Sequence, residues 1–303
     1  MFWSARVVAE PAARPRRAAA RSRRVEPVLP LWFTLLLAAA VTAVTVYGLG
    51  YADAYRVSPG VRETLPDTLR GQDLLTLLTV PALIGTAMRA RRGSLRGHLV
   101  WLALLLYYAY SYLMYVVAPF NDVFLLYVAV IGLSTYGLFD GLVRIDIPAA
   151  APAFTPVRTR ALAYFLLAVG TLFTALWLSE IIPAIPGGLP DGLFVYDIPS
   201  TVHVLDLAYV LPLIVATGVL LLRGHRAAPV LAVLVLVKML TLGLALLLMD
   251  AFVVAGGGEL SDPSEPYIWG AITVISAGWL YALMRRVDPA PPGWLRPELW
   301  PQP

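Results

Sequence analysis

Long apolar runs separated by short polar stretches dominate the chain from residue 31 onwards. Each run is close to 20 residues long, which is about the length that an α-helix needs to cross the hydrocarbon core of a bilayer. The runs lie at about 31–51, 73–89, 99–119, 123–143, 161–182, 204–222, 228–254 and 267–285. The pattern predicts an all-α protein, a polytopic transmembrane helical bundle of about eight spans.

The segments that flank the spans have a different character. Residues 1–30 contain seven Arg together with Pro and Ala and show no apolar face, which predicts a disordered basic tail. The first apolar run has span length and lacks a small-x-small cleavage site, so it is typical of a span rather than a signal peptide. The predicted organisation is this tail, an eight-span domain over 31–290 and a cytoplasmic C-terminal tail over 291–303.

The composition agrees with the pattern and excludes several classes of function. Hydrophobic residues make up 59% of the 303 residues and charged residues 14%, which leaves too little polar surface for a water-soluble body. Cysteine is absent, which excludes disulfides, thiol catalysis and Cys-ligated metals. No glycine-rich phosphate loop, serine elbow or metalloprotease helix motif occurs. We expect no cofactor, no metal and no nucleic acid; the expected partners are the lipid bilayer and an unidentified small molecule, ion or lipid.

The basic residues fall almost entirely on one side of the predicted spans. The N-terminal tail, the C-terminal tail and the loops after the even-numbered spans carry nineteen Arg, whereas the opposite side carries three. This positive-inside pattern predicts that both termini are cytoplasmic. A basic content of 22 Arg and one Lys, with abundant Ala, Leu and Pro, indicates a GC-rich bacterial genome and hence a bacterial plasma membrane. The three Arg on the opposite side are Arg56, Arg62 and Arg70.

One short phrase occurs twice, 133 positions apart. Residues 66–74 read PDTLRGQDL and residues 199–207 read PSTVHVLDL, with Pro, Thr, Asp and Leu in the same places. Each copy lies at the outer end of the second span in a set of four, and an intramembrane proline follows it. The repetition predicts a 4+4 parallel internal repeat with halves at about 31–143 and 161–285. The predicted helix N-caps are Asp67 and Ser200, and the prolines are Pro81 and Pro212.

The repeat places one aspartate in each half. Asp73 follows Arg70 by three positions, and Asp206 follows His203 by three, so each pair shares a helix face. One interpretation is that each carboxylate is stabilised near a helix N-terminus by its basic neighbour. The other is that the two carboxylates flank the outer mouth of a shared cavity, where their repulsion would create a proton-accepting site.

Lys238 is the one basic residue deep inside a span, roughly 16 Å from its inner end. We expect its ammonium to face the bundle interior, since lipid exposure at that depth costs about 3 kcal/mol. The register places the third-span tyrosines Tyr107 and Tyr108 at its level and no carboxylate. Tyr108, Tyr112 and Tyr115 share a face; packing and interhelical hydrogen bonds are the alternative explanation for them.

Glu180 and Asp250 lie near outer span ends and could join an outer acidic cluster. No catalytic residue can be assigned from these patterns. The candidate binding residues are Arg70, Asp73, Tyr108, Tyr112, Glu180, His203, Asp206 and Lys238.

Three segments resemble a known group of proteins. GQDLLTLLTVPALI, FNDVFLLYVAVIGLSTYGL and VHVLDLAYVLP are similar to parts of uncharacterised multi-spanning bacterial, actinobacterial-type, integral membrane proteins. The resemblance extends over most of the chain from the first span to the eighth. It supports the architecture and, because these proteins have no established activity, implies no substrate and no catalytic residue.

Three functions remain open at this point. The first is a small-solute or ion transporter with a polar site between two four-helix halves. The second is a membrane-embedded enzyme acting on a lipid or isoprenoid at the outer leaflet, with Asp73, Asp206 or Glu180 as general acid or base and Lys238 as an electrostatic stabiliser. The third is a non-catalytic membrane subunit or sensor.

The distribution of arginines generates a topology prediction. Reporter domains fused after residue 60 and after residue 155 should report the outside and the cytoplasm, respectively. A protease-protection or reporter-activity assay in cells measures this, and the reversed pattern would refute the predicted orientation.

Overall fold

The structure is a computed structural model. It describes residues 31–55, 64–116, 120–154, 159–185, 194–195, 198–199, 201–260, 262–285, 287 and 291–296. The predicted tail over 1–30, the end of the C-terminal tail over 297–303 and the predicted N-cap Ser200 lie outside these residues.

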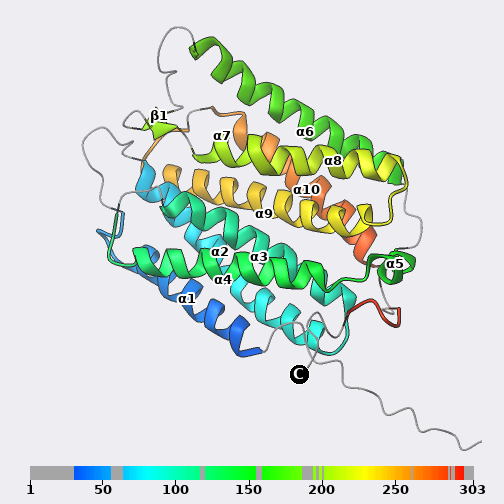
Figure 1. The fold of residues 1–303 in the computed structure, drawn as a ribbon. Helices are drawn as coiled ribbons and strands as arrows, with labels where there is room; N and C mark the ends of the chain where they lie inside the picture. Colours follow the sequence, from blue (N-terminus) through cyan, green and yellow to red (C-terminus); the bar gives the residue numbers. More distant parts are fainter. Residues whose placement is uncertain are drawn as a thin grey trace, which may run out of the picture.

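Eight helices in the described part of the chain are long and apolar enough to cross a membrane, which confirms the predicted transmembrane bundle (Figure 1). Six are uninterrupted, namely the four spans of the first half and the last two spans; one is lengthened by a short 3-10 turn, and one is divided. The spans are α1 (Leu31–Gly50), α2 (Leu65–Arg91), α3 (Leu95–Val116), α4 (Phe124–Val143), α6 (Thr159–Ile181) with η2 (Ile182–Ala184), α7 (Thr201–Leu205) with η3 (Asp206–Val210) and α8 (Leu211–Leu222), α9 (Ala228–Ala255), and α10 (Glu265–Met284).

Four small elements occupy the connections of the described chain. A short helix and a 3-10 turn follow α4, and a two-residue antiparallel pair precedes α7. These are α5 (Ile147–Ala150), η1 (Ala151–Ala153), β1 (Phe194–Val195) and β2 (Ile198–Pro199). Below, the terminal side is the side where α1 begins and α10 ends, and the far side is the side where α1 ends and α2 begins.

The second span begins earlier than its hydropathy predicts. α2 starts at Leu65 with Thr64 as its N-cap, so the prediction of Asp67 as the N-cap is wrong. Pro66 is tolerated because a first-turn residue has no intrahelical partner for its N–H. The Asp67 carboxylate instead accepts a hydrogen bond from Arg70 at 3.3 Å. Asp73 therefore lies roughly 12 Å inside the helix rather than at its start.

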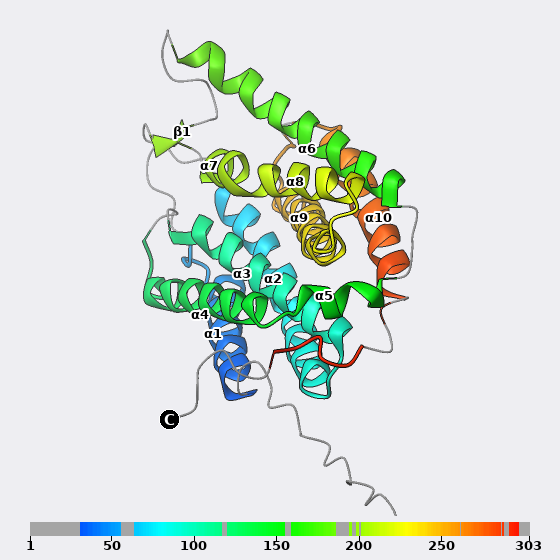
Figure 2. The ribbon, with the colours of Figure 1, turned by 45° about the vertical axis from the view of Figure 1, so that its right-hand side comes forward.

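The helices pack in two connected sets. In the first, α1 packs on α2, α2 on α3, α3 on α4 and α4 on α1; in the second, α6 packs on α8, α8 on α9 and α9 on α10. The sets meet where α2 and α3 pack along α9. In Figures 1 and 2, α6 lies at the edge of the bundle, beyond α8. The contact pattern places α3 and α9 at the centre of the molecule.

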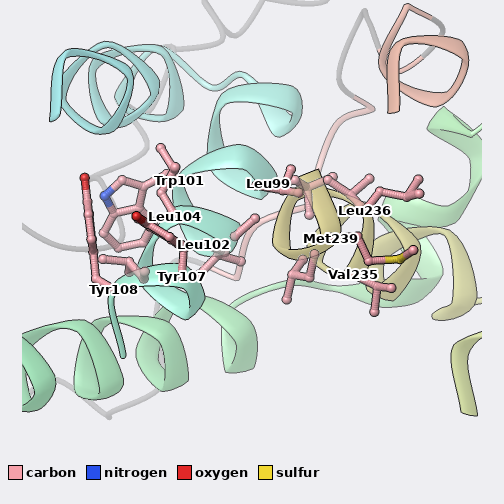
Figure 3. Close-up of a cluster of buried hydrophobic side chains, with 14 of the residues drawn as sticks. Leu99, Trp101, Leu102, Leu104, Tyr107, Tyr108, Val235, Leu236 and Met239 are labelled. Carbon is pink, nitrogen blue, oxygen red and sulfur yellow. The ribbon is translucent and has the colours of Figure 1, made fainter. Parts of the chain in front are cut away.

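Side chains of α3 and α9 form the middle of the core. Leu99 and Leu102 of α3 and Leu236 of α9 are fully buried, and Met239 lies beside them (Figure 3). Lipid tails are as apolar as these side chains, so close packing rather than the hydrophobic effect holds such helices together. The α3–α9 contact is therefore a tightly packed one.

Glycines permit the closest backbone approaches. A Cβ on Gly71 of α2 would lie 2.6 Å from backbone atoms of Leu248 and Met249 on α9. Gly170 of α6 and Gly218 of α8 likewise face side chains of each other's helix. Small residues at helix contacts are the usual means of bringing transmembrane helices together.

The C-terminal segment crosses the terminal side of the bundle. The Trp294 indole donates to Gly93 O at 3.2 Å in the turn between α2 and α3. The Asp146 amide donates to Trp294 O, and the Arg296 amide donates to Arg144 O, both at 2.8 Å. These bonds connect the α2–α3 turn to the segment that follows α4.

The contact at Gly71 yields a stability prediction. Gly71→Ala should lower the free energy of unfolding by about 1–3 kcal/mol, since its Cβ meets backbone that cannot rotate away. Gly85→Ala on the same helix is the matched control, because no atom lies within 4 Å of its Cβ. Thermal unfolding of the purified variants in detergent measures both. Equal stability of the two variants would contradict the close approach of α2 and α9.

Candidate functional site

The tyrosines of α3 belong to separate polar clusters in the interior of the bundle. Five of them are buried, and because successive helical residues are turned by about 100°, they face different neighbours. They are Tyr107, Tyr108, Tyr110, Tyr112 and Tyr115.

Tyr110 connects a buried acid to a buried base. Its hydroxyl donates to Asp206 Oδ1 at 2.8 Å, and the Lys238 Nζ atom lies 3.4 Å from its ring centroid. Trp177 of α6 donates its indole N–H to Asp206 Oδ2 at 3.1 Å. Asp206 is 5% exposed and Lys238 is 3% exposed. We refer to Asp206, Tyr110, Lys238 and Trp177 as the acid–base site.

The helix is irregular where Asp206 lies. Residues Asp206–Val210 form a π-helical segment, in which the Leu211 amide donates to Asp206 O, five positions back. Pro212 follows immediately and has no N–H to continue an α-helical ladder. π-helical segments inside α-helices occur frequently at functional sites.

A continuous series of contacts leads from the acid–base site to the far-side surface. The His203 ring lies edge-on to Trp177, with centroids 4.4 Å apart. His203 Nε2 lies 3.3 Å from a Glu180 carboxylate oxygen, and the Glu180 side chain is 42% exposed. Glu180, His203, Asp206 and Lys238, which the sequence nominated separately, are thus brought together. Among the described residues, no three His, Asp or Glu side chains converge as metal ligands.

The surroundings of Lys238 confirm one prediction and correct two others. Its side chain faces the bundle and a tyrosine of the third span, as predicted. The tyrosine is Tyr110, however, and not Tyr107 or Tyr108. Asp206 and Lys238 both contact Tyr110, so the expectation of no carboxylate at this level is wrong. A comparison of Cα depths omits the length of a lysine chain and a tyrosine ring, which together close the gap.

Asp73 belongs to a different cluster. It is 1% exposed and accepts hydrogen bonds from the hydroxyls of Tyr55 and, at 2.9 Å, Tyr115. Burial and the neighbouring Asp73 carboxyl raise the pKa of Tyr55, which lies in the turn after α1, so its phenol stays protonated as a donor. Gly48 of α1 leaves the space that the Asp73 carboxylate fills.

Arg70 and Tyr112 complete the surroundings of Asp73. Arg70 donates to Ala52 O at 3.0 Å, in the same turn that carries Tyr55. The Tyr112 ring stacks on Tyr115 at a centroid distance of 5.3 Å. The Arg70 bond connects the turn after α1 to α2, and the bonds of Tyr55 and Tyr115 to Asp73 bring α3 to the same place, which is a structural task.

The middle of the α2–α3 contact holds a third set of hydrogen bonds. The Gln72 amide donates to Tyr107 OH at 2.7 Å, and Tyr107 OH lies 2.8 Å from Thr76 Oγ1. Tyr108 OH lies 2.9 Å from Thr79 Oγ1. Tyr108 is therefore engaged within the first half, away from Lys238.

The two repeated aspartates do not flank a common mouth, and that expectation is wrong. Their tyrosine partners on α3, Tyr110 and Tyr115, are five positions apart, so they point about 140° apart around the helix. Asp73 lies among α1, α2 and α3, whereas Asp206 lies against α3 and α6 and close to Lys238 of α9. Similar local sequence has been placed in two different environments.

The site also includes residues that the sequence did not nominate. Tyr110 stands in the same aromatic run as Tyr108 and Tyr112. It does not lie on the helix face that Tyr108, Tyr112 and Tyr115 share, so that pattern did not predict it. Trp177 is a single aromatic residue in an apolar span, and no spacing connects it to Asp206. Tyr55 lies in a loop 18 positions before Asp73.

No known protein family, no curated protein and no solved structure matches this chain.

Proposed function

We propose that the protein is a transporter of small solutes, with the acid–base site as its binding and proton-coupling centre. The observation that carries the proposal is the pair Asp206 and Lys238, an acid and a base buried inside a transmembrane bundle and joined through one tyrosine.

Burying Asp206 and Lys238 in the bundle costs free energy. An Asp or Lys at the centre of a spanning helix costs about 2.5–3.5 kcal/mol relative to the aqueous phase on insertion scales. Tyr110 and Trp177 offset part of that cost through a cation–π contact, which contributes about 2 kcal/mol when desolvated, and through hydrogen bonds to the carboxylate. Buried ionisable residues in spans commonly mark ion pathways and proton relays.

The position of the site also favours transport. Tyr110 belongs to the proposed first half, 31–143, while Trp177, Asp206 and Lys238 belong to the second, 161–285. Ligand sites in helical bundles commonly lie between helices, as this one does. α2 packs along α9, whereas α3 contacts α7 over a short stretch only. Movement of α7 and η3 against α3 would therefore disturb few contacts while changing the surroundings of Asp206.

The chemistry of the site suits the coupling of solute transport to proton movement. Asp206 can exchange a proton with water that enters from the far side, where the His203–Glu180 pair lies beside Trp177; the Trp177 indole itself only donates a hydrogen bond to the carboxylate. Protonation changes the carboxylate from an acceptor into a donor, which alters its hydrogen bond with Tyr110. The π-helical segment gives η3 a place to shift by one residue when that bond changes.

A liposome assay tests the proposed function. The protein is reconstituted into vesicles that contain a pH-sensitive dye and exposed to sugars, amines, amino acids and carboxylates in turn. At least one class should drive proton movement that protein-free vesicles do not show. Asp206→Asn and Lys238→Met should each slow it about tenfold or more, since a hydrogen bond to a charged group contributes about 1.5–3 kcal/mol.

Asp262→Asn and Arg223→Met serve as matched controls, because both residues are exposed and lie outside the acid–base site. Their rates should equal that of the unchanged protein. If no solute class moves protons faster than in empty vesicles, the protein is not a proton-coupled transporter.

A further inference from the structure

Lys238 is the group in the acid–base site whose bonding is least complete. Its ammonium has three N–H donors, and among the described residues it has no hydrogen-bond acceptor; its Nζ atom lies over the face of Tyr110, at 3.4 Å from the centroid. Among the described residues, no Asp or Glu forms an ion pair with it. A buried cation without an acceptor is costly, and an incoming anion removes that cost.

Asp206, unlike Lys238, has hydrogen-bond partners. Tyr110 donates to one of its carboxylate oxygens and Trp177 to the other. An incoming ammonium group would compete with one of these two donors. It would also leave the Lys238 ammonium without a hydrogen-bond acceptor. The hydrogen-bond inventory therefore favours a ligand that brings an acceptor for Lys238 over a ligand that brings a cation for Asp206.

We propose that the site binds a small organic anion, a carboxylate, on Lys238 together with one proton on Asp206. The inference rests on the proposed function and names its substrate class. Carboxylates suit the site because two oxygens can accept from one ammonium group in charge-assisted hydrogen bonds.

The proton follows from charge balance. A carboxylate beside Lys238 would also lie near Asp206, and two like charges in a low-dielectric interior repel strongly. Uptake of one proton from water by Asp206 leaves one cation and one anion in the site. The groups that face Asp206 are Tyr110 from α3, Trp177 from α6 and Lys238 from α9, with His203 from α7 against Trp177. Substrate and proton thus enter as a neutral pair.

Binding to the purified protein in lipid nanodiscs tests this inference. The probes are acetate, L-lactate and benzoate as anions, L-alanine as a zwitterion and choline as a cation. Thermal unfolding and tryptophan fluorescence are the two readouts; Trp177 makes the fluorescence sensitive to the site, and a Trp177→Phe variant assigns the signal. At least one carboxylate should bind, and it should bind more tightly at mildly acidic than at mildly alkaline pH.

The variants separate the roles of the two charged residues. Lys238→Met should weaken carboxylate binding about tenfold or more, because it removes the charge-assisted donor. Lys238→Arg should restore part of the affinity. Asp206→Asn should keep carboxylate binding and remove its pH dependence. Circular dichroism and size-exclusion chromatography establish that each variant is folded.

Several results would overturn the inference. They are binding of alanine or choline without any of the three carboxylates, no binding of any carboxylate, and equal carboxylate affinity in folded Lys238→Met. The vesicle assay keeps this outcome separate from the fate of the proposed function. Movement of an amine or sugar without carboxylate binding leaves a transporter of another substrate class, whereas carboxylate binding without any solute movement leaves an anion-binding membrane protein.

Discussion

A single side chain, Tyr110, contacts a buried acid and a buried base at the same time. Its hydroxyl donates to Asp206 and its ring face lies against the ammonium of Lys238. The three residues come from α3, η3 and α9, so the contact connects the first four helices to the last four through polar groups. The Asp206 carboxylate and the Lys238 ammonium therefore share one partner, which the first four helices contribute.

Two other sets of buried polar residues lie apart from that contact and bond among themselves. Asp73, although it repeats the local sequence of Asp206, is saturated by Tyr55 and Tyr115 and holds the turn after α1 in place. Gln72, Thr76 and Tyr107 satisfy one another between α2 and α3. Such complete bonding is what a low-dielectric interior demands of structural polar groups. Lys238 differs from these groups because it is a buried charged side chain with no hydrogen-bond acceptor among the described residues and it lies beside the partner of a buried acid, which is why the acid–base site, and not the Asp73 cluster, is the functional candidate.

The sequence predicted the architecture well because hydropathy is read at the scale of whole spans. Eight runs became eight helices, and the cost of a charge in lipid was enough to turn Lys238 inward. Predictions of which side chains lie together were wrong where they depended on the rotation of one helix against another. Tyr108 and Tyr110 are two positions apart and face different neighbours, and Trp177 reaches Asp206 from a helix 29 positions away. Those relationships arise from packing between helices, which a periodic pattern along one helix does not contain.

The most direct test of the account is a double-mutant cycle on the acid–base site. The rate of solute-driven proton movement is measured for Asp206→Asn, for Lys238→Met and for the two substitutions combined. If the acid and the base act as one unit through Tyr110, the combined variant should be no slower than the slower single variant, because either change already breaks the unit. If the two losses multiply instead, Asp206 and Lys238 act independently and the central claim is wrong.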